Sequence, residues 1–389
     1  MSGENNNSTD LETRCIHGGK DFNTEGIRPI SMPIYQTASF SHIEPGHNGS
    51  GFDYTRESNP TRSALEKTVT ALEGAADSLA FTSGMAAINT VFELFSPGDH
   101  IICGGDLYGG TVRLMKLIAE KNGIKITCVD SGDISRVKEA VEENTRAIYI
   151  ETPGNPMMKI TDIKECACIS HGIGALLIVD NTFLSPYFQN PIELGADIVV
   201  HSGSKFLSGH NDTIAGFLCM ADKSLADKIR LLTKTIGNAL SPFDSWLVMR
   251  GIKTLAVRME REQENAIKLV DWFLGKDFVK KVYYPGLENH PGYEINLKQA
   301  RGSGAMISVE VDSKERALAI LQNVKVLTFA ESLGGTESLV TYPCVQTHPD
   351  VPVKVREALG INDRLLRFSI GLESVSDLME DIEQAAKKV

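Results

Sequence analysis

The sequence lacks any apolar run of about 18 residues, the length that a membrane-spanning helix needs, so we expect no transmembrane helix and no membrane partner. Its first residues, MSGENNNSTDLETRC, also lack the basic region and apolar stretch of a secretory leader, and we expect none. Positive charge is in deficit as well, because 39 Lys and Arg residues stand against 50 Asp and Glu, for a net charge of −11. An acidic chain without Lys/Arg clusters is a poor candidate for binding nucleic acid. These absences favour a cytoplasmic enzyme that acts on a small molecule.

Paired cysteines are missing too. The seven cysteines are odd in number and form no C-x-x-C pair, whereas disulfide frameworks and zinc sites rely on paired spacings. Cys166 and Cys168 are two residues apart on an expected helix, where their side chains would not face each other. We therefore expect reduced, mostly buried thiols, which again favours the cytoplasm, and no bound metal.

The chain is long enough for two domains, since 389 residues exceed one typical hydrophobic core. From about residue 60 to 220, short apolar runs alternate with helical patterns, which predicts an α/β fold with a mostly parallel sheet flanked by helices. In NPTRSALEKTVTALEG, Asn59 can cap a helix, Pro60 suits its first turn and Gly74 suits its end. The expected strands are 78–81, 100–103, 124–129, 147–150, 175–180, 197–200 and 214–220, with helices at 111–121, 134–143 and 162–171.

After residue 220 the pattern changes to long helices and alternating strands, which predicts a smaller α+β domain with antiparallel strands that are buried on one face. The expected elements are helices at about 222–235 and 243–275 and strands at 303–311 and 364–371. We place the domain boundary near residue 250, inside the second long helix. The expected domains are an N-terminal segment 1–60, a first domain 61–250 and a second domain 251–389.

Polar residues follow two neighbouring apolar runs of the expected parallel sheet. The run ALLIVD ends on Asp180, and DIVVHSGSK places Ser202, Ser204 and Lys205 directly after the next run. Ligands of open α/β sheets bind beyond the carboxyl ends of the strands. We therefore expect a binding site at these residues.

A third segment, FTSGMAA, places Ser83, Gly84 and Met85 at the start of a helix, where free N–H groups and the helix dipole attract a phosphate. A lysine, a carboxylate and a phosphate cradle are together what pyridoxal phosphate (PLP) requires. Each has an ordinary alternative: Asp180 as a turn residue, the Ser83 segment as a plain helix start and Lys205 as a surface lysine. Their coincidence favours the cofactor. A nicotinamide enzyme is disfavoured because FTSGMAA lacks G-x-G-x-x-G.

With the segment DNTFLSPYFQNPIELGADIVVHSGSKFLSGHND, the chain resembles the Cys/Met-metabolism family of PLP-dependent enzymes from about residue 12 to 388. The resemblance implies PLP fold type I, the aspartate-aminotransferase-like fold, and a homotetramer built from tight dimers. It also implies covalent attachment of the cofactor to Lys205. Family members include cystathionine γ-synthase, cystathionine γ- and β-lyases, methionine γ-lyase and homoserine sulfhydrylases.

The resemblance implies further roles in the first domain. In GFDYTRESNPTR, Tyr54 and Arg56 resemble the pair that reaches the cofactor phosphate of the neighbouring subunit. In DLYGGT, Tyr108 resembles the tyrosine that stacks on the cofactor ring and assists the leaving group. ETPGNP supplies Glu151 and Asn155, of which the asparagine resembles the partner of the cofactor's phenolic oxygen. Ser202 and Ser204 are implied to contact the phosphate and the lysine.

In the second domain, Arg367 of RLLRFSIGLE resembles the arginine that binds the substrate α-carboxylate, while Arg364, on the opposite strand face, is expected to be structural. Ser332 and Leu333 of AESLGGTESLVTYP resemble a loop that touches substrate and cofactor.

The pocket wall must decide the substrate, which the resemblance implies to be a sulfur amino acid. Glu331 resembles the acid that meets the distal ammonium of cystathionine, and Asp53 and Arg113 are candidates to complete that polar wall. The loop Gly109–Gly110 lacks the cysteine common in methionine γ-lyases. We expect a carbon–sulfur lyase that cleaves cystathionine by γ- or β-elimination. The open alternatives are cystathionine γ-synthase, methionine γ-lyase and O-acetylhomoserine sulfhydrylase. A catalytically silent member is disfavoured by the intact lysine, aspartate, tyrosine and arginine.

Overall fold

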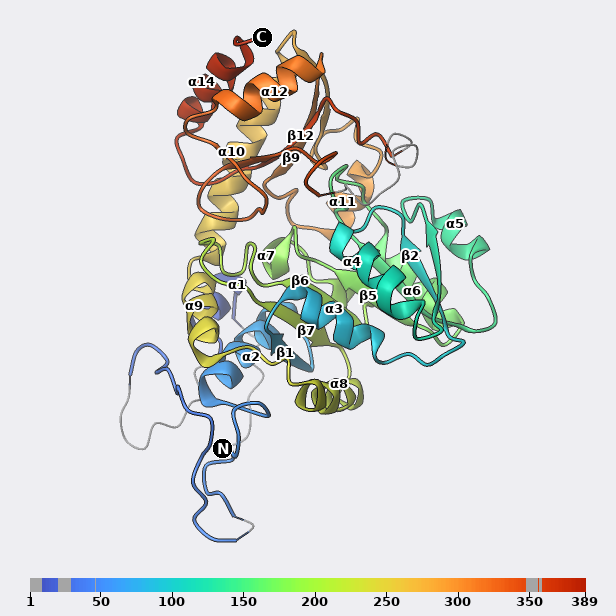
Figure 1. Ribbon diagram of the computed structural model, residues 1–389, viewed down its shortest axis with the longest axis vertical. Helices are drawn as coiled ribbons and strands as arrows, with labels where there is room; N and C mark the ends of the chain where they lie inside the picture. The colour runs from blue at the N-terminus through green and yellow to red at the C-terminus, as the bar shows by residue number, and fades with distance from the viewer. Residues whose placement is uncertain (1–8, 20–28, 46, 348–355, 357–358) are drawn as a thin grey trace.

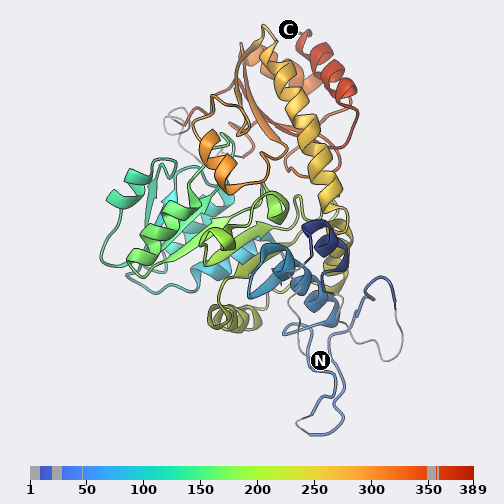
Figure 2. The same ribbon diagram turned by 180° about the vertical axis from the view of Figure 1, so that it is seen from behind.

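The computed structural model describes residues 9–19, 29–45, 47–347, 356 and 359–389, which form two lobes (Figure 1). The lower lobe contains a seven-stranded sheet and the upper lobe a five-stranded sheet. The helix α10 (Leu255–Leu274) runs from the lower lobe into the upper one, as the front and back views both show (Figures 1 and 2). None of the described helices is both long enough and apolar enough to cross a membrane.

The large sheet confirms the predicted α/β class. Its strand order is β1-β7-β6-β5-β4-β2-β3, and only β7 runs antiparallel to its neighbours. Each expected strand segment overlaps one observed strand. These are β1 (Asp77–Phe81), β2 (His100–Gly104), β3 (Lys125–Val129), β4 (Thr145–Glu151), β5 (Leu176–Asp180), β6 (Ile198–Ser202) and β7 (Gly216–Met220).

Helices cover both faces of this sheet, so its central strands are apolar on both sides. In β4, Ala147 and Tyr149 pack into one core while Ile148 and Ile150 pack into the other, as the two-residue period of a strand requires. The helical elements of this lobe are α1 (Leu11–His17), α2 (Pro60–Glu73), α3 (Gly84–Phe92), α4 (Gly109–Leu114), the π-helical turn η2 (Met115–Ala119), α5 (Ile134–Glu139), α6 (Ile163–Gly172), α7 (Ser185–Phe188), the 3₁₀ turn η3 (Pro191–Leu194), α8 (Lys223–Ile236) and α9 (Pro242–Ile252).

The predicted helix after Asn59 is confirmed as α2. The Asn59 side chain accepts a hydrogen bond from the N–H of Thr61, Pro60 stands in the first turn, and Gly74 ends the helix with a φ of +70°. Residues 111–121, expected as one helix, form α4 followed by η2, and the expected helix 134–143 ends earlier, at Glu139.

The small sheet has the order β10-β11-β12-β9-β8, and its central pairs are antiparallel as expected. The expected one-sided burial is wrong, because all five residues of β12 are buried. Helices pack on one face, whereas the other face contacts the lower lobe, where Ser308 donates to the carbonyl of Pro156 (2.6 Å). The elements are β8 (Val279–Tyr283), β9 (Met306–Val311), β10 (Thr328–Phe329), β11 (Leu339–Thr341), β12 (Leu365–Ser369), α11 (Tyr293–Gln299), α12 (Lys314–Asn323) and α14 (Val375–Ala386).

The single helix expected at 243–275 is also wrong, because α9 ends at Ile252 and α10 begins at Leu255. The Arg258 guanidinium donates a hydrogen bond to the Gly251 carbonyl (3.0 Å). The Thr254 N–H donates to the same oxygen, which belongs to the residue three positions earlier (3.1 Å). These bonds replace the regular helical ladder at the break. The proposed domain division at residue 250 lies just before it and stays a prediction.

Candidate active site

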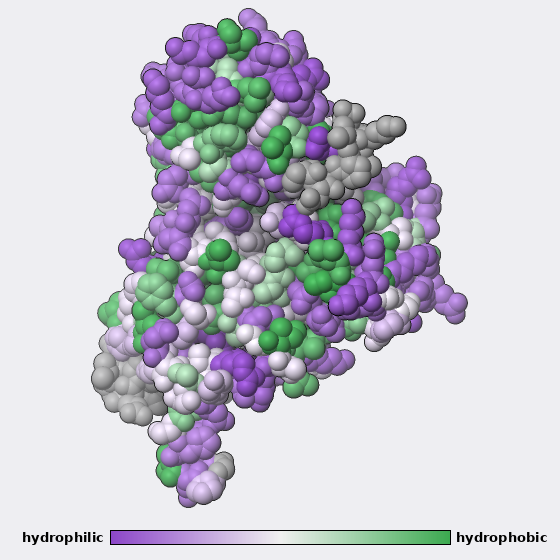
Figure 3. All heavy atoms as spheres, in the orientation of Figure 1, coloured by the Kyte–Doolittle hydropathy of each residue, from purple (hydrophilic) through white to green (hydrophobic). Residues whose placement is uncertain are grey.

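A cavity of about 540 Å³ lies between the lobes, at the carboxyl ends of β4, β5 and β6. Figure 3 shows a recess between the two lobes. Both lobes contribute side chains to the lining. The lower lobe provides, among others, Ser83, Gly84, Met85, Tyr108, Glu151, Asn155, Asp180, Thr182, Ser202, Ser204 and Lys205, and the upper lobe provides Glu331, Ser332, Leu333 and Arg367. The predicted strand-end residues therefore meet in one place.

Lys205 follows β6 and is held in the cavity by a hydrogen bond from its Nζ to Ser332 Oγ (2.9 Å). Burial, helped by the positive charge of Arg367, lowers the pKa of Lys205 to about 8, while Glu331 acts in the opposite direction. A large fraction of this amine is therefore neutral near pH 8. Such an amine can act as a nucleophile or as a base.

The start of α3 forms an anion cradle against β6. Ser83 caps the helix by accepting from the N–H of Ala86 (3.0 Å). A side chain at Gly84 would lie 3.1 Å from Ser202 Cβ, and one at Gly216 would lie 2.2 Å from the Ser83 carbonyl oxygen. Glycine at both positions thus allows the helix start to approach the strand. The free N–H groups of a first helical turn suit a phosphate group.

Ser204 is oriented by the neighbouring strand, because its hydroxyl donates to the Ala215 carbonyl (3.2 Å) and accepts from the Ala215 N–H (2.9 Å). Asp180 ends β5, and one of its carboxylate oxygens accepts from the N–H and the hydroxyl of Thr182 (3.0 and 2.6 Å). Burial raises the pKa of Asp180. The sequence reading missed Thr182, which also binds the Ser202 N–H (2.9 Å). Its position two residues after an aspartate is typical of an Asx-turn.

Tyr108 precedes α4 and lies 41% exposed at the cavity. Its backbone N–H donates to Glu151 Oε2 (2.9 Å), which links the β2–α4 loop to the end of β4. Burial is the main cause that raises the pKa of the Tyr108 phenol, and Glu331 adds to it. The phenol is therefore protonated at neutral pH and can donate a hydrogen bond.

The small sheet contributes a cation. Arg367 of β12 is 2% exposed and donates to Asn155 Oδ1 (2.8 Å) and to the Ser332 carbonyl (3.1 Å). Thr341, which the sequence reading missed, accepts a third bond (3.3 Å). Burial lowers the pKa of Arg367 to about 10. Ser332 has a φ of +124°, a backbone conformation that non-glycine residues rarely adopt.

Arg364 is placed differently from Arg367. It lies just before β12 and forms an ion pair with Glu310 (2.5 Å), which fits the predicted structural role.

Four predicted residues do not line the cavity. Asp53 pairs with His42 (2.9 Å). Arg113 is exposed on α4, and its positive charge partly opposes the rise in the pKa of Tyr108. Tyr54 and Arg56 line a separate pocket of about 380 Å³. Both belong to the arm, residues 29–45 and 47–59, which projects from the lower lobe (Figure 1).

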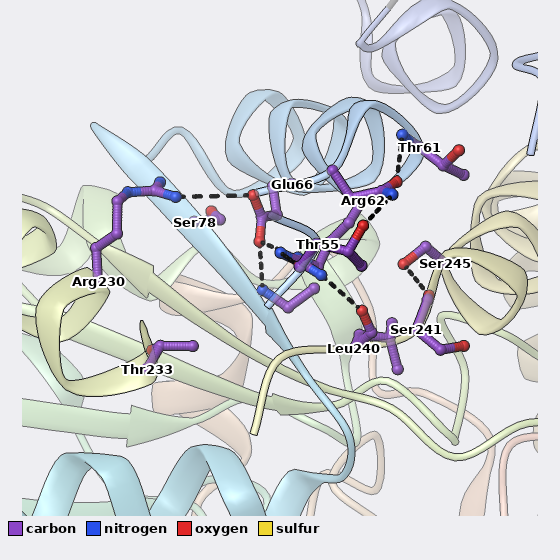
Figure 4. Close-up of polar contacts among 12 residues, drawn as sticks. Thr55, Thr61, Arg62, Glu66, Ser78, Arg230, Thr233, Leu240, Ser241 and Ser245 are labelled. Atoms are coloured by element: carbon purple, nitrogen blue, oxygen red, sulfur yellow. Dashed lines mark hydrogen bonds and ion pairs between the residues drawn. The ribbon is translucent and has the colours of Figure 1, made fainter. Parts of the chain in front are cut away.

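Buried polar contacts hold the base of the arm on the lower lobe. Arg62 of α2 donates to the Thr55 carbonyl (2.7 Å) and to the Leu240 carbonyl (2.9 Å), as Figure 4 shows. Glu66, on the same helix as Arg62, pairs with Arg62 and accepts a hydrogen bond from the Ala80 N–H of β1. The arm is therefore attached firmly at its base, while Tyr54 and Arg56 lie outside the lining of the chain's own cavity. In the described part of the chain, no group of three or more His, Cys, Asp or Glu side chains is arranged to hold a metal ion.

Comparison with known proteins identifies the setting of this cavity. A family model described as "Cys/Met metabolism PLP-dependent enzyme" matches residues 12–387. The cystathionine beta-lyase of Lactococcus lactis subsp. cremoris (strain MG1363) is 47% identical over 98% of this chain and 100% of its own length. The cystathionine gamma-lyase of Bacillus subtilis (strain 168) is 46% identical over 97% and 99%, respectively.

Two solved structures share the fold across nearly the whole chain. The structure of cystathionine gamma-lyase from Lactobacillus plantarum complexed with L-serine has a TM-score of 0.95 at 42% identity, covering 98% of this chain and 99% of that one. The structure of cystathionine gamma synthase from Xanthomonas oryzae pv. oryzae in complex with cystathionine has a TM-score of 0.94 at 37% identity, covering 97% and 98%.

Proposed function

We propose that this chain, which belongs to the Cys/Met metabolism family of PLP-dependent enzymes, is a carbon–sulfur lyase that cleaves cystathionine and releases a thiol amino acid, ammonia and a 2-oxo acid. The observation that carries the proposal is the position of Lys205. It lines one cavity together with the strand-end residues of the large sheet and Arg367, and its amine is held there by Ser332. Relatives named for β-elimination and for γ-elimination are almost equally similar, so the proposal covers both.

The residues of the cavity fit the cofactor that the family requires. Ser83, Gly84 and Ser202 make a cradle with no room for an extra Cβ, which suits the phosphate. Asp180 is a buried carboxylate to which Thr182 donates at only one oxygen, Oδ1, so it suits the protonated ring nitrogen. Lys205 suits the aldehyde. When bound, PLP supplies an electron-withdrawing ring that stabilises negative charge at the substrate Cα.

Lys205 is the proposed base. Its Nζ takes the proton from the substrate Cα and can deliver it elsewhere on the substrate, so one amine serves both β- and γ-elimination. Ser332 Oγ orients this amine through the 2.9 Å hydrogen bond. Tyr108 also lines the cavity, and its phenol donates a proton to the departing sulfur.

Arg367 binds the substrate α-carboxylate in this proposal. The guanidinium matches a carboxylate in a two-bond fork, and the contacts to Asn155 and Ser332 fix its orientation. Glu331 also lines the cavity and faces the distal ammonium of cystathionine. The two groups together select a substrate with charges at both ends.

The loop after Tyr108 argues against methionine as the preferred substrate. A Cβ at Gly110 would lie 2.4 Å from the Tyr108 ring and 2.8 Å from Met85 Sδ. A cysteine there, as in many methionine γ-lyases, would therefore displace the tyrosine.

The second candidate is cystathionine γ-synthase, which the Xanthomonas oryzae structure favours because it shares the fold at a TM-score of 0.94. One assay separates the candidates. Purified enzyme is given cystathionine alone, and the products are identified by mass spectrometry. Homocysteine with pyruvate establishes β-cleavage, and cysteine with 2-oxobutyrate establishes γ-cleavage. No cleavage, together with cystathionine formation from an O-acyl-homoserine and cysteine, would replace the lyase by the synthase.

We also propose a homotetramer built from dimers in which Tyr54 and Arg56 contact the cofactor phosphate of the neighbouring subunit. Neither residue lines its own chain's cavity, and hydrophobic side chains are exposed on the arm and the lower lobe (Figure 3), with Ile30 at 85%, Ile43 at 75% and Phe243 at 53%. Light scattering during size-exclusion chromatography tests this assembly, and a fully active monomer would contradict it. The seven free cysteines support a cytoplasmic location.

A further inference from the structure

Glu151 and Asp180 form a pair of carboxyl groups on the floor of the cavity. They are the last residues of β4 and β5 and lie opposite each other in the parallel register. Register partners of neighbouring strands point to the same face of a sheet. Both line the cavity, and they are only 8% and 7% exposed. Two carboxylates this close and this buried are unfavourable when both are ionised.

The two carboxyl groups have different partners. Asp180 accepts two hydrogen bonds from Thr182, whereas Glu151 Oε2 accepts the Tyr108 backbone N–H (2.9 Å). That bond fixes the backbone of Tyr108 immediately before α4 and therefore holds the tyrosine at the cavity. A neutral carboxylic acid can also accept this N–H, through its carbonyl oxygen. The bond is stronger to a carboxylate and so lowers the pKa of Glu151, but burial and the Asp180 charge act in the opposite direction.

Most of the charged groups around Glu151 disfavour its ionised form. Asp180, Asp106 of the β2–α4 loop and the Tyr149 phenol are acidic neighbours, and Arg367 across the cavity is the cation among the groups that act on it. Arg367 is also engaged with Asn155 and Ser332 and is proposed to bind the substrate. Burial and the Asp180 charge raise the pKa of Glu151 well above its usual range.

We propose that Glu151 is a positioning residue that stands in the working site as a neutral carboxylic acid. It holds Tyr108 through the backbone N–H and leaves Asp180 as the single anion of the pair for the cofactor's ring nitrogen. This inference rests on the proposed function for the role of Tyr108. The protonation of Glu151 itself does not depend on which substrate is cleaved.

Infrared difference spectra of the holoenzyme at pH 7 test the protonation state directly. Subtracting the spectrum of Glu151→Gln from that of the wild type should reveal the C=O stretching band of a neutral carboxylic acid. The control is Glu264→Gln, whose exposed carboxyl is paired with Lys268 and Arg261, and whose pKa is lowered. It should remove carboxylate bands only. Carboxylate bands in the Glu151 difference spectrum would overturn the proposal.

Kinetics and the cofactor spectrum test the positioning role. Glu151→Gln keeps an oxygen for the Tyr108 N–H, so its kcat should fall much less than that of Glu151→Ala, and the pH midpoint of the cofactor absorbance should stay in place. Glu151→Ala leaves that N–H without its partner and should lower kcat about tenfold. A Gln variant as impaired as the Ala variant, or one that shifts the midpoint, would mean that Glu151 acts as an anion.

A third measurement needs no variant and covers the case in which the substitutions prevent folding. In an atomic-resolution crystal structure of the wild-type holoenzyme, a neutral Glu151 has two unequal carboxyl C–O bonds, and equal bonds would refute the proposal. The spectra and bond lengths require no turnover. Failure of the lyase assay would therefore remove the proposed function without deciding the state of Glu151.

Discussion

The two walls of the cavity differ in charge and in construction. The wall on the large sheet carries carboxyl groups, with Asp180 and Glu151 at strand ends and Lys205 directly after β6. The wall on the small sheet carries Arg367 in the middle of an antiparallel strand. A substrate amino acid offers an amine to the first wall and a carboxylate to the second. The lower lobe therefore supplies the groups that react, and the upper lobe supplies the group that orients the substrate.

The second wall also acts on the first across the cavity. The Arg367 charge lowers the pKa of Lys205, and the Glu331 charge raises the pKa of the Tyr108 phenol. Damage to the first wall should therefore reduce kcat, whereas damage to the second should mainly raise KM and shift the protonation of the first.

The largest effect is expected at the catalytic amine. Lys205→Ala removes the proposed base and the cofactor attachment, so kcat should fall by at least about 10³-fold. The measurement is 2-oxo acid release from cystathionine. Lys159→Ala, which removes a half-buried lysine paired with Asp130 outside the cavity lining, is the control and should retain full activity. A fully active Lys205→Ala enzyme would refute the assignment of the first wall.

The second wall is tested by Arg367→Met, which removes the proposed partner of the substrate carboxylate. KM for cystathionine should rise about 10- to 100-fold, the loss expected for a charge-assisted hydrogen bond. Arg364→Met is a matched control three residues away that faces Glu310 instead of the cavity. Equal effects of the two substitutions would show that Arg367 acts only through stability.

The arm belongs to neither wall of its own chain, so a substitution there tests whether a third segment contributes to cofactor binding. Arg56→Met should weaken retention of the cofactor about tenfold, since one charge-assisted bond to its phosphate is lost. Equilibrium dialysis against PLP measures this affinity. The subunit count by light scattering should stay the same. Unchanged cofactor affinity would mean that Arg56 serves the arm's own contacts, such as that with the Lys234 carbonyl.

The smallest expected effect is a shift in protonation. In protein stripped of cofactor, labelling of Lys205 by an amine-directed reagent should increase through a midpoint near pH 8, because only the neutral amine reacts. Arg367→Met should move this midpoint upward, since a neighbouring positive charge disfavours the protonated lysine. Peptide mass spectrometry quantifies the label. A midpoint that stays in place would show that the walls do not interact.

Local features of the fold were predictable where neighbouring residues decide them. The cap, first turn and end of α2 follow from Asn59, Pro60 and Gly74, and the structure has all three. The strand-end residues were also predictable, because parallel strands deliver their last residues to one edge of a sheet. The roles that the family resemblance implies for Tyr54, Arg56, Asp53 and Arg113 stay predictions.

Features that depend on distant contacts were not predictable in the same way. The break between α9 and α10 lies where the Arg258 guanidinium donates a hydrogen bond to the Gly251 carbonyl. The strand β12 is buried on both faces because the lower lobe covers one of them. The contact of Thr182 with Asp180 is local, but only the fold brings the Ser202 N–H of the next strand to the Thr182 hydroxyl.

The amino-acid sequence alone determined the α/β class, the order of the strands along the chain and the residues that follow them, because these depend on periodicity, caps and turns. Only the tertiary structure decided that Glu151 would stand beside Asp180 and that Arg367 would face Lys205. Burial and the distance between charges set the protonation of such groups. Both quantities arise when segments far apart in the chain pack together.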